Sequence, residues 1–166
     1  MMNSLLLQNK FTALPMNILM VCLGNICRSP MAEGIMNQKI RLNQLSWRVD
    51  SAGTGGWHVG ETPDERAVKV MKKNGIDISQ YVARQFSADD FIHFDKIYVM
   101  DSTNYLDVIR QCPHAEYKKK IDLILNITHP GMNQAVPDPY YGEMNGFDYV
   151  FRLLNEACQR IIDLHG

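Results

Sequence analysis

The sequence has no apolar run long enough to cross a membrane, which takes about 20 residues in a helix. It also has no excess of one charge, because 17 basic and 18 acidic residues leave a net charge of −1. Broad positive surfaces are what bind nucleic acids and anionic membranes. The composition therefore predicts neither a nucleic acid nor a membrane as a partner, although it leaves room for a local basic site.

The four cysteines lack the paired spacing of a disulfide-stapled domain, so we expect free thiols and a reducing, cytoplasmic setting. His58 and His93 do not combine with the cysteines in the spacing of a zinc site. The sequence therefore predicts no metal and no cofactor.

The chain lacks internal repeats and an inter-domain linker, and 166 residues suit one domain with one core. We assign this domain to residues 16–166. Residues 1–15 contain three consecutive leucines but no basic segment of the kind that opens a signal peptide. They are either an N-terminal extension or residues that precede a functional start at Met16.

Four short apolar segments alternate with helical patterns, which predicts an α/β fold. We expect strands at residues 17–23, 47–52, 96–100 and 121–125. We expect helices at residues 30–42, from Thr62 to Lys73, just after Ser87, around residues 102–111, and at 146–164. Ser29 and Pro30 suit the cap and the first position of the first helix, and Thr62 to Glu65 suit a capping box.

The loop at residues 22–28, here called the phosphate loop, is the strongest functional signal. It carries Cys22 at a strand end and Arg28 near a helix start, and Asn25 can bond locally to hold a strained backbone. Such a loop aims several N–H groups at one point and, with the helix dipole, forms an anion site. An anion site stabilises a cysteine thiolate, and the planar fork of Arg28 suits phosphate oxygens. The sequence therefore predicts a thiolate beneath a bound phosphate.

The segment Val21 to Pro30 resembles the signature loop of the low-molecular-weight protein tyrosine phosphatases. The resemblance runs from about Met16 to the C-terminus, through the following further motifs: Asp50 to Thr54, Ala83 to Gln85, Met100 to Asn104, and Asp138 to Gly142. It implies one four-stranded parallel sheet in the order 2-1-3-4. It also implies hydrolysis of phosphotyrosine in protein substrates, and of aryl phosphates, through a phosphocysteine on Cys22.

Each site residue receives a role from this resemblance together with its own chemistry. The local sequence, with Asp138 between two prolines, predicts only a turn. The resemblance implies that Asp138 is the general acid. The remaining roles fall to these residues: Leu23, Gly24, Asn25, Ile26, Cys27 and Arg28 bind phosphate, Ser29 and Asp101 support the loop, and Trp57, Tyr140 and Tyr141 form the substrate cleft.

Three of these residues keep an alternative. Asp101 supports the loop or only caps a helix, and Trp57 forms a cleft wall or folds back onto the core. Cys27 forms a redox pair with Cys22 or only fills space beneath the loop. We expect the enzyme to be a monomer or a weak dimer.

Other classes of protein fit less well. An arsenate reductase of this fold needs a cysteine pair in the middle of the chain, where none occurs, and a protein-arginine phosphatase has threonine in place of Ile26. A dithiol redox protein would leave Arg28 and Asp138 without a role. A non-catalytic phosphate-binding module would not need the full set of catalytic side chains.

Overall fold

The computed structural model describes residues 13–166, so the prediction for residues 1–15 falls largely outside the described residues. Its core is one parallel sheet in the order β2-β1-β3-β4. The strands are β1 (Asn17–Cys22), β2 (Arg48–Gly53), β3 (Lys96–Val99) and β4 (Ile121–Leu123). The predicted α/β class and strand order are confirmed.

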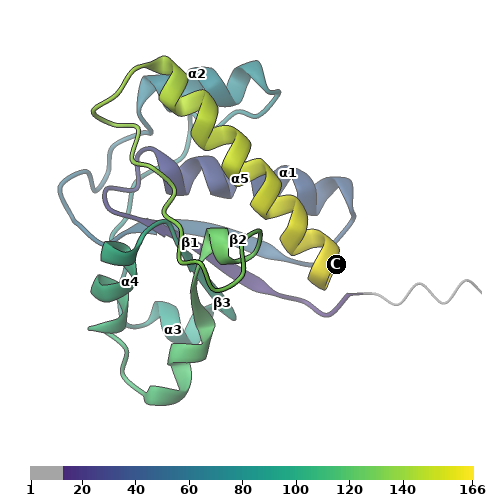
Figure 1. The fold of residues 1–166 in the computed structure, drawn as a ribbon, viewed down its shortest axis with the longest axis vertical. Coiled ribbons are helices and arrows are strands. Elements are labelled where there is room, and N and C mark those ends of the chain that lie inside the picture. Colours follow the sequence, from purple (N-terminus) through teal and green to yellow (C-terminus); the bar gives the residue numbers. More distant parts are fainter. Residues whose placement is uncertain (1–12) are drawn as a thin grey trace, which may run out of the picture.

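Helices cover both faces of this sheet (Figure 1). On one side lie α1 (Arg28–Leu42), α2 (Glu65–Lys73) and α5 (Met144–His165), and on the other lie α3 (Asp90–His93) and α4 (Ser102–Ile109). Two 3-10 helices, Ala115–Lys120 and Ile124–Asn126, flank β4. No helix in residues 13–166 combines the length and apolar character that spanning a membrane requires.

β1 is the centre of the core because both of its faces are covered. Ile18, Met20 and Cys22 belong to the apolar cluster beneath α1 and α5, whereas Leu19 and Val21 belong to the cluster beneath α3 and α4. Burial on both faces explains why the strand is apolar at nearly every position and does not alternate.

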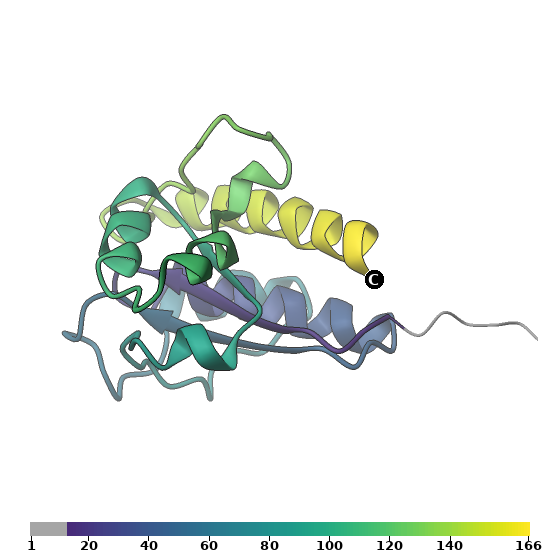
Figure 2. The same cartoon turned by 90° about the horizontal axis from the view of Figure 1, so that it is seen from below.

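The connections after β1 and β3 cover opposite faces of the sheet, so they diverge at the carboxyl ends of these two neighbouring strands. Open α/β sheets bind ligands at such a point. The arrowheads of β1 and β2 lead to the same end of the molecule, opposite to the C-terminus of α5 (Figure 2). The phosphate loop follows β1 and Asp101 follows β3 at this end.

Two predicted helix starts are wrong. α1 begins at Arg28, with Cys27 at the N-cap position, so Ser29 is inside the first turn and does not cap the helix. α2 begins at Glu65 and its cap is Asp64, whose side chain accepts the Arg66 N–H at 2.8 Å, and not Thr62. In both places a tertiary hydrogen bond outweighs the local capping preference. Ser29 bonds to loop side chains, and the Asp64 N–H donates to the Ile26 carbonyl at 2.8 Å.

Candidate active site

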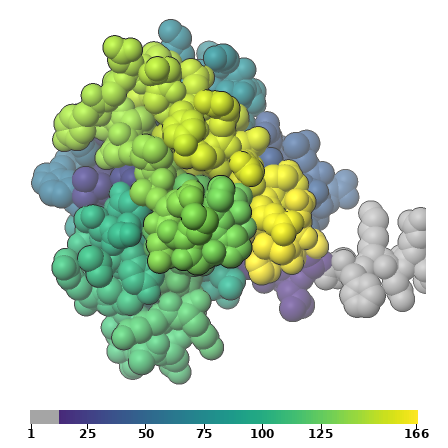
Figure 3. Space-filling view, viewed as in Figure 1, coloured from purple at the N-terminus to yellow at the C-terminus, as the bar shows by residue number. Residues whose placement is uncertain are grey.

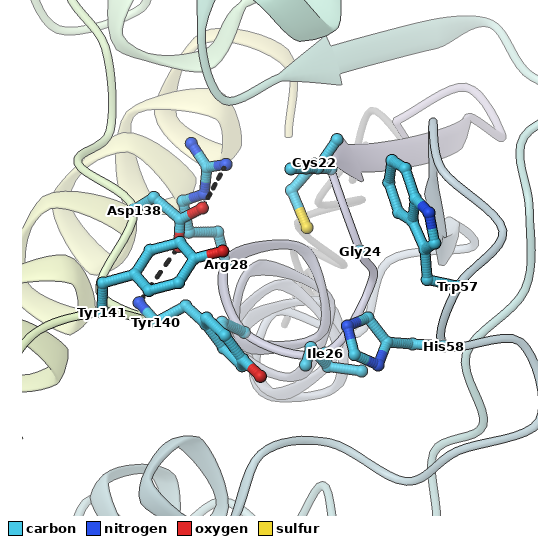
Figure 4. A pocket seen from close by; sticks show the side chains of 11 residues that line it. Cys22, Gly24, Ile26, Arg28, Trp57, His58, Asp138, Tyr140 and Tyr141 are labelled. Atoms are coloured by element: carbon cyan, nitrogen blue, oxygen red, sulfur yellow. Dashed lines mark hydrogen bonds and ion pairs between the residues drawn. The ribbon is translucent and has the colours of Figure 1, made fainter.

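A cavity of about 290 Å³ opens at the carboxyl end of β1. In the space-filling view, purple atoms of the early chain show at the left between blue, teal and lime-green segments (Figure 3). The close view shows the Cys22 sulfur between Trp57 on one side and Asp138 with Tyr141 on the other (Figure 4). Segments more than a hundred residues apart thus share one cavity, which is lined by Cys22, Leu23, Gly24, Ile26, Cys27, Arg28, Trp57, His58, Asp138, Tyr140 and Tyr141.

The backbone of the phosphate loop faces two ways. Three of its carbonyls bond outward: Cys22 accepts from Thr54, Leu23 from Gly55, and Ile26 from Asp64. Within residues 13–166, the N–H groups of residues 23–27 donate to no protein acceptor. Paired carbonyls and unpaired N–H groups, together with the N-terminus of α1, are the ingredients of an anion site.

Asn25 holds this loop in its unusual shape. Its φ of 56° lies in the left-handed region, which only a few non-glycine residues enter. Its side-chain amide donates to Ser29 Oγ at 2.8 Å and to Ser51 Oγ at 2.9 Å, and its side-chain oxygen accepts the Arg84 N–H at 3.0 Å. The side chain is buried, so these three bonds satisfy it and fix the turn.

Cys22 Sγ lies 3.0 Å from Ser29 Oγ. The Asn25 amide donates to this hydroxyl, which leaves the single Ser29 proton for the sulfur or for its more distant acceptor, the Ala52 carbonyl at 3.4 Å. A hydrogen bond to the charged form favours a thiolate. Ser29 therefore lies inside the first turn of α1, with its hydroxyl beside the Cys22 sulfur.

Arg28 is buried, and its Nη1 donates to Asp101 Oδ2 at 2.7 Å and to the Val136 carbonyl at 3.0 Å. Burial opposes its charge, but Cys22 and the hydrogen bond to Asp101 raise the pKa of Arg28 overall. The other oxygen of Asp101 accepts the Asn104 N–H at 2.8 Å in a capping box. Asp101 thus binds Arg28 through one carboxylate oxygen and caps α4 through the other.

Asp138 lies opposite the sulfur, at the end of a segment fixed by Val136. The Val136 N–H donates to the Met100 carbonyl at 2.8 Å, which ties this segment to the end of β3. Asp138 Oδ2 is 3.5 Å from Arg28 Nη2, and Oδ1 accepts the Tyr140 N–H at 3.1 Å. The contact with Arg28 is long, so Nη2 remains available for another partner.

Aromatic side chains border the cavity. Trp57 is 72% exposed, so it is not folded back onto the core, and it lies against its own neighbour Gly55. Tyr140 packs edge-on against Tyr141, which is 91% exposed. His58, which the sequence did not single out for this role, lies 6.3 Å from the Tyr140 ring between centroids and bonds to Glu61 at 2.7 Å.

Several supporting residues had no role assigned from the sequence. The Arg84 guanidinium joins Asp50 to Asp90, while its backbone meets Asn25 and Gly53. Gly53 touches the loop so closely that a Cβ would lie 2.8 Å from the Leu23 carbonyl oxygen. Gly53 and Arg84 lie in two of the motifs that carry the family resemblance, Asp50 to Thr54 and Ala83 to Gln85. Their contacts, however, depend on the tertiary structure. In the part of the chain that the structure describes, no three metal-binding side chains cluster.

Cys27 is buried at the N-cap of α1, is among the residues that line the cavity, and is a poor thiolate. Burial is the largest cause of the raised pKa of the Cys27 thiol, and Asp64, Cys22 and Asp138 raise it further. Of the two loop cysteines, Cys22 has the hydroxyl donor beside its sulfur and faces the cavity (Figure 4).

Comparison with known proteins agrees with this geometry. The sequence matches the family model of low molecular weight phosphotyrosine protein phosphatases over residues 17–164. It is 44% identical over 148 residues to a protein of that name from Schizosaccharomyces pombe, covering 87% of this chain and 94% of the relative. The resemblance noted in the sequence is therefore confirmed.

Solved structures agree as well. A protein tyrosine phosphatase from Entamoeba histolytica superposes with a TM-score of 0.83 at 40% identity, covering 89% of this chain and 95% of that one. A Drosophila arginine phosphatase superposes with a TM-score of 0.83 at 33% identity, covering 90% and 97%.

Glu33, on α1, generates a prediction about stability. Its carboxylate accepts from Ser51 Oγ at 2.5 Å, and Ser51 accepts from Asn25, so Glu33 ends the network that holds the phosphate loop. Burial, aided by Asp50, raises the pKa of Glu33 to about 7 against the opposing effects of the Ser51 bond and Arg84. A carboxyl with a raised pKa binds its proton more tightly in the folded chain.

The stability that Glu33 contributes is therefore present below its unfolded pKa and lost as the pH rises through about 7. Between about pH 5 and about pH 8, the free energy of unfolding of the wild type should fall by about 1–2 kcal/mol relative to Glu33→Gln. Urea unfolding across this range measures it, with the exposed Glu156→Gln as the control. A constant difference between wild type and Glu33→Gln would show that Glu33 does not titrate in this window.

Proposed function

We propose that this chain, which belongs to the low molecular weight phosphotyrosine protein phosphatase family, hydrolyses phosphotyrosine in proteins through a phosphocysteine on Cys22. One observation carries the proposal: the Cys22 sulfur, the unpaired N–H groups of the phosphate loop, Arg28 and Asp138 face a single cavity. A reducing compartment, the cytoplasm, would keep the Cys22 thiol available.

In the first step the Cys22 thiolate attacks phosphorus, a sulfur–phosphorus bond forms, and the bond to the tyrosyl oxygen breaks. The N–H groups of residues 23–27 and Arg28 hold the equatorial oxygens, with Arg28 Nη2 leaving its long contact with Asp138. Asp138 gives its proton to the departing oxygen. In the second step Asp138 takes a proton from water, which attacks phosphorus and releases phosphate and the thiolate.

The border of the cavity supports an aromatic phosphate ester. Trp57, Tyr140 and Tyr141 present ring surfaces around the opening, and a tyrosyl ring gains from contact with them. Turnover of a phosphotyrosine peptide and a phosphoarginine peptide, compared by kcat/KM, tests this preference. A higher kcat/KM on the phosphoarginine peptide would contradict it, and no turnover of either would leave only a phosphate-binding module.

The nucleophile is tested by Cys22→Ser. Serine keeps the size of the side chain but is a much weaker nucleophile at neutral pH, so turnover of p-nitrophenyl phosphate should fall by several orders of magnitude. Vanadate binding should persist because the loop N–H groups and Arg28 remain. Cys112→Ser, outside the cavity lining, is the matched control. Wild-type turnover by Cys22→Ser would rule out the phosphocysteine.

The acid is tested by Asp138→Asn, which preserves shape but cannot donate a carboxylic proton. A positioned acid contributes roughly 10²- to 10⁴-fold, and we expect a loss of that size on phenyl phosphate. The loss should shrink as the leaving group becomes more acidic, because a good leaving group needs no proton. Asp163→Asn on the exposed end of α5 is the control. A loss that is equal for all leaving groups would place the acid elsewhere.

The redox pair remains a proposal with its own test. Peroxide would convert the Cys22 thiolate to a sulfenic acid with loss of hydroxide, and the Cys27 thiol would then close a disulfide with loss of water. The raised pKa of the Cys27 thiol slows this second step, because the thiolate is the reactive form. We expect dithiothreitol to restore peroxide-treated wild type but to restore Cys27→Ser poorly, as measured by recovered turnover. Equal recovery would assign Cys27 to packing alone.

A further inference from the structure

Arg66, in the first turn of α2, bonds to the backbone that follows the proposed acid. Its Nη2 donates to the Tyr140 carbonyl at 2.9 Å, and its Nη1 donates to the Gly142 carbonyl at 3.0 Å. These carbonyls lie two and four residues after Asp138, in a segment without helix or strand. The Gly142 N–H donates to the Pro139 carbonyl at 3.0 Å, so Arg66 holds a tight turn at two points.

The same guanidinium is fixed on its other side by Asp64. Nε lies 3.0 Å from Asp64 Oδ1, and Nη2 lies 2.8 Å from Asp64 Oδ2, which is a bidentate pair. Hydrogen bonds from Arg66 hold the pKa of Asp64 below its usual range, as expected for a charged pair. Since the Asp64 N–H also donates to the Ile26 carbonyl, one continuous set of bonds joins the phosphate loop to the turn after Asp138.

Aromatic contacts restrict the guanidinium further. Its central carbon lies 4.7 Å from the centre of the Phe147 ring, which is fully buried at the start of α5, and 5.8 Å from that of Tyr140. Arg66 does not line the cavity. Apart from its charge, which acts to lower the pKa of the Cys27 thiol, Arg66 acts on the site through the residues that it holds.

Asp138 is then anchored from both directions along the chain. On the preceding side, Val136 bonds to Met100 and to Arg28. On the following side, Arg66 bonds to Tyr140 and Gly142. Prolines at 137 and 139 stiffen the segment but cannot set its distance from a loop more than a hundred residues away in sequence.

We propose that Arg66 is a positioning residue for the general acid, which sets the distance between Asp138 and the Cys22 sulfur through its bonds to Asp64, Tyr140 and Gly142. The proposal rests on the acid role proposed above for Asp138. Lysine cannot replace it, because a single ammonium cannot reach two carbonyls while paired bidentately with a carboxylate.

The test is a double-mutant cycle between Arg66→Lys and Asp138→Asn. Misplacing a catalytic group by about 1 Å costs up to about 10²-fold, so Arg66→Lys should lose about ten- to a hundredfold in kcat/KM on phenyl phosphate. The loss should shrink for aryl phosphates with more acidic leaving groups. In the Asp138→Asn background, Arg66→Lys should have almost no further effect, because no acid remains to be positioned.

Two further variants separate positioning from folding. Lys73→Met removes the cation at the other end of α2, which pairs with Asp148 at 3.3 Å, and should change neither kcat/KM nor its leaving-group dependence. Asp64→Asn keeps an oxygen acceptor at the cap but weakens the pair, and should reproduce the leaving-group dependence of Arg66→Lys. Vanadate binding by each variant verifies that the phosphate loop is intact.

The outcomes distinguish this proposal from the one on which it rests. If Asp138→Asn depends steeply on the leaving group but Arg66→Lys lowers all substrates equally, or adds fully to Asp138→Asn, the role of Arg66 is overturned while the acid stands. If Asp138→Asn shows no such dependence, the acid assignment is overturned together with this role of Arg66.

Discussion

The structure of the site depends on a loop whose backbone N–H groups, at residues 23–27, have no acceptor within residues 13–166. Unpaired N–H groups and a left-handed Asn25 both cost free energy, so the five residues between β1 and α1 would not hold this shape alone. The surrounding chain compensates by binding the outward-facing carbonyls and the Asn25 side chain. β2, the loop after it, the start of α2 and Arg84 all contribute one such bond or more.

The positive charge of the site belongs to a buried side chain. Arg28 is a buried cation, and its ion pair with Asp101 and bond to Val136 satisfy Nη1 fully while Nη2 keeps only the long contact with Asp138. A buried cation that lacks one good partner attracts an anion strongly. The cost of moving the guanidinium out of water has already been offset by its other bonds. The arrangement therefore suits a doubly charged phosphate ester better than a neutral ligand.

The sequence predicted what depends on local order and missed what depends on contacts between distant segments. Cys22, Asn25 and Arg28 share one loop, so their meeting could be anticipated, whereas the strand order needed the family resemblance because periodicity does not specify neighbours. Ser29 was misjudged as a cap because its local preference gave way to Cys22 and Asn25. Arg66 carried no signal at all, since both carbonyls it binds lie more than seventy residues away.

The two halves of the site are held by bonds that differ in their exposure to water. The network of Asn25, Ser29 and Ser51 is buried, so breaking one of its bonds would leave a polar group without water. The bonds of Arg66 to the turn after Asp138 are about one-third exposed at the arginine, so water can replace them at lower cost. We therefore expect the phosphate loop to be the more rigid half, while the position of the turn after Asp138 depends on Arg66 and is the easier of the two to perturb.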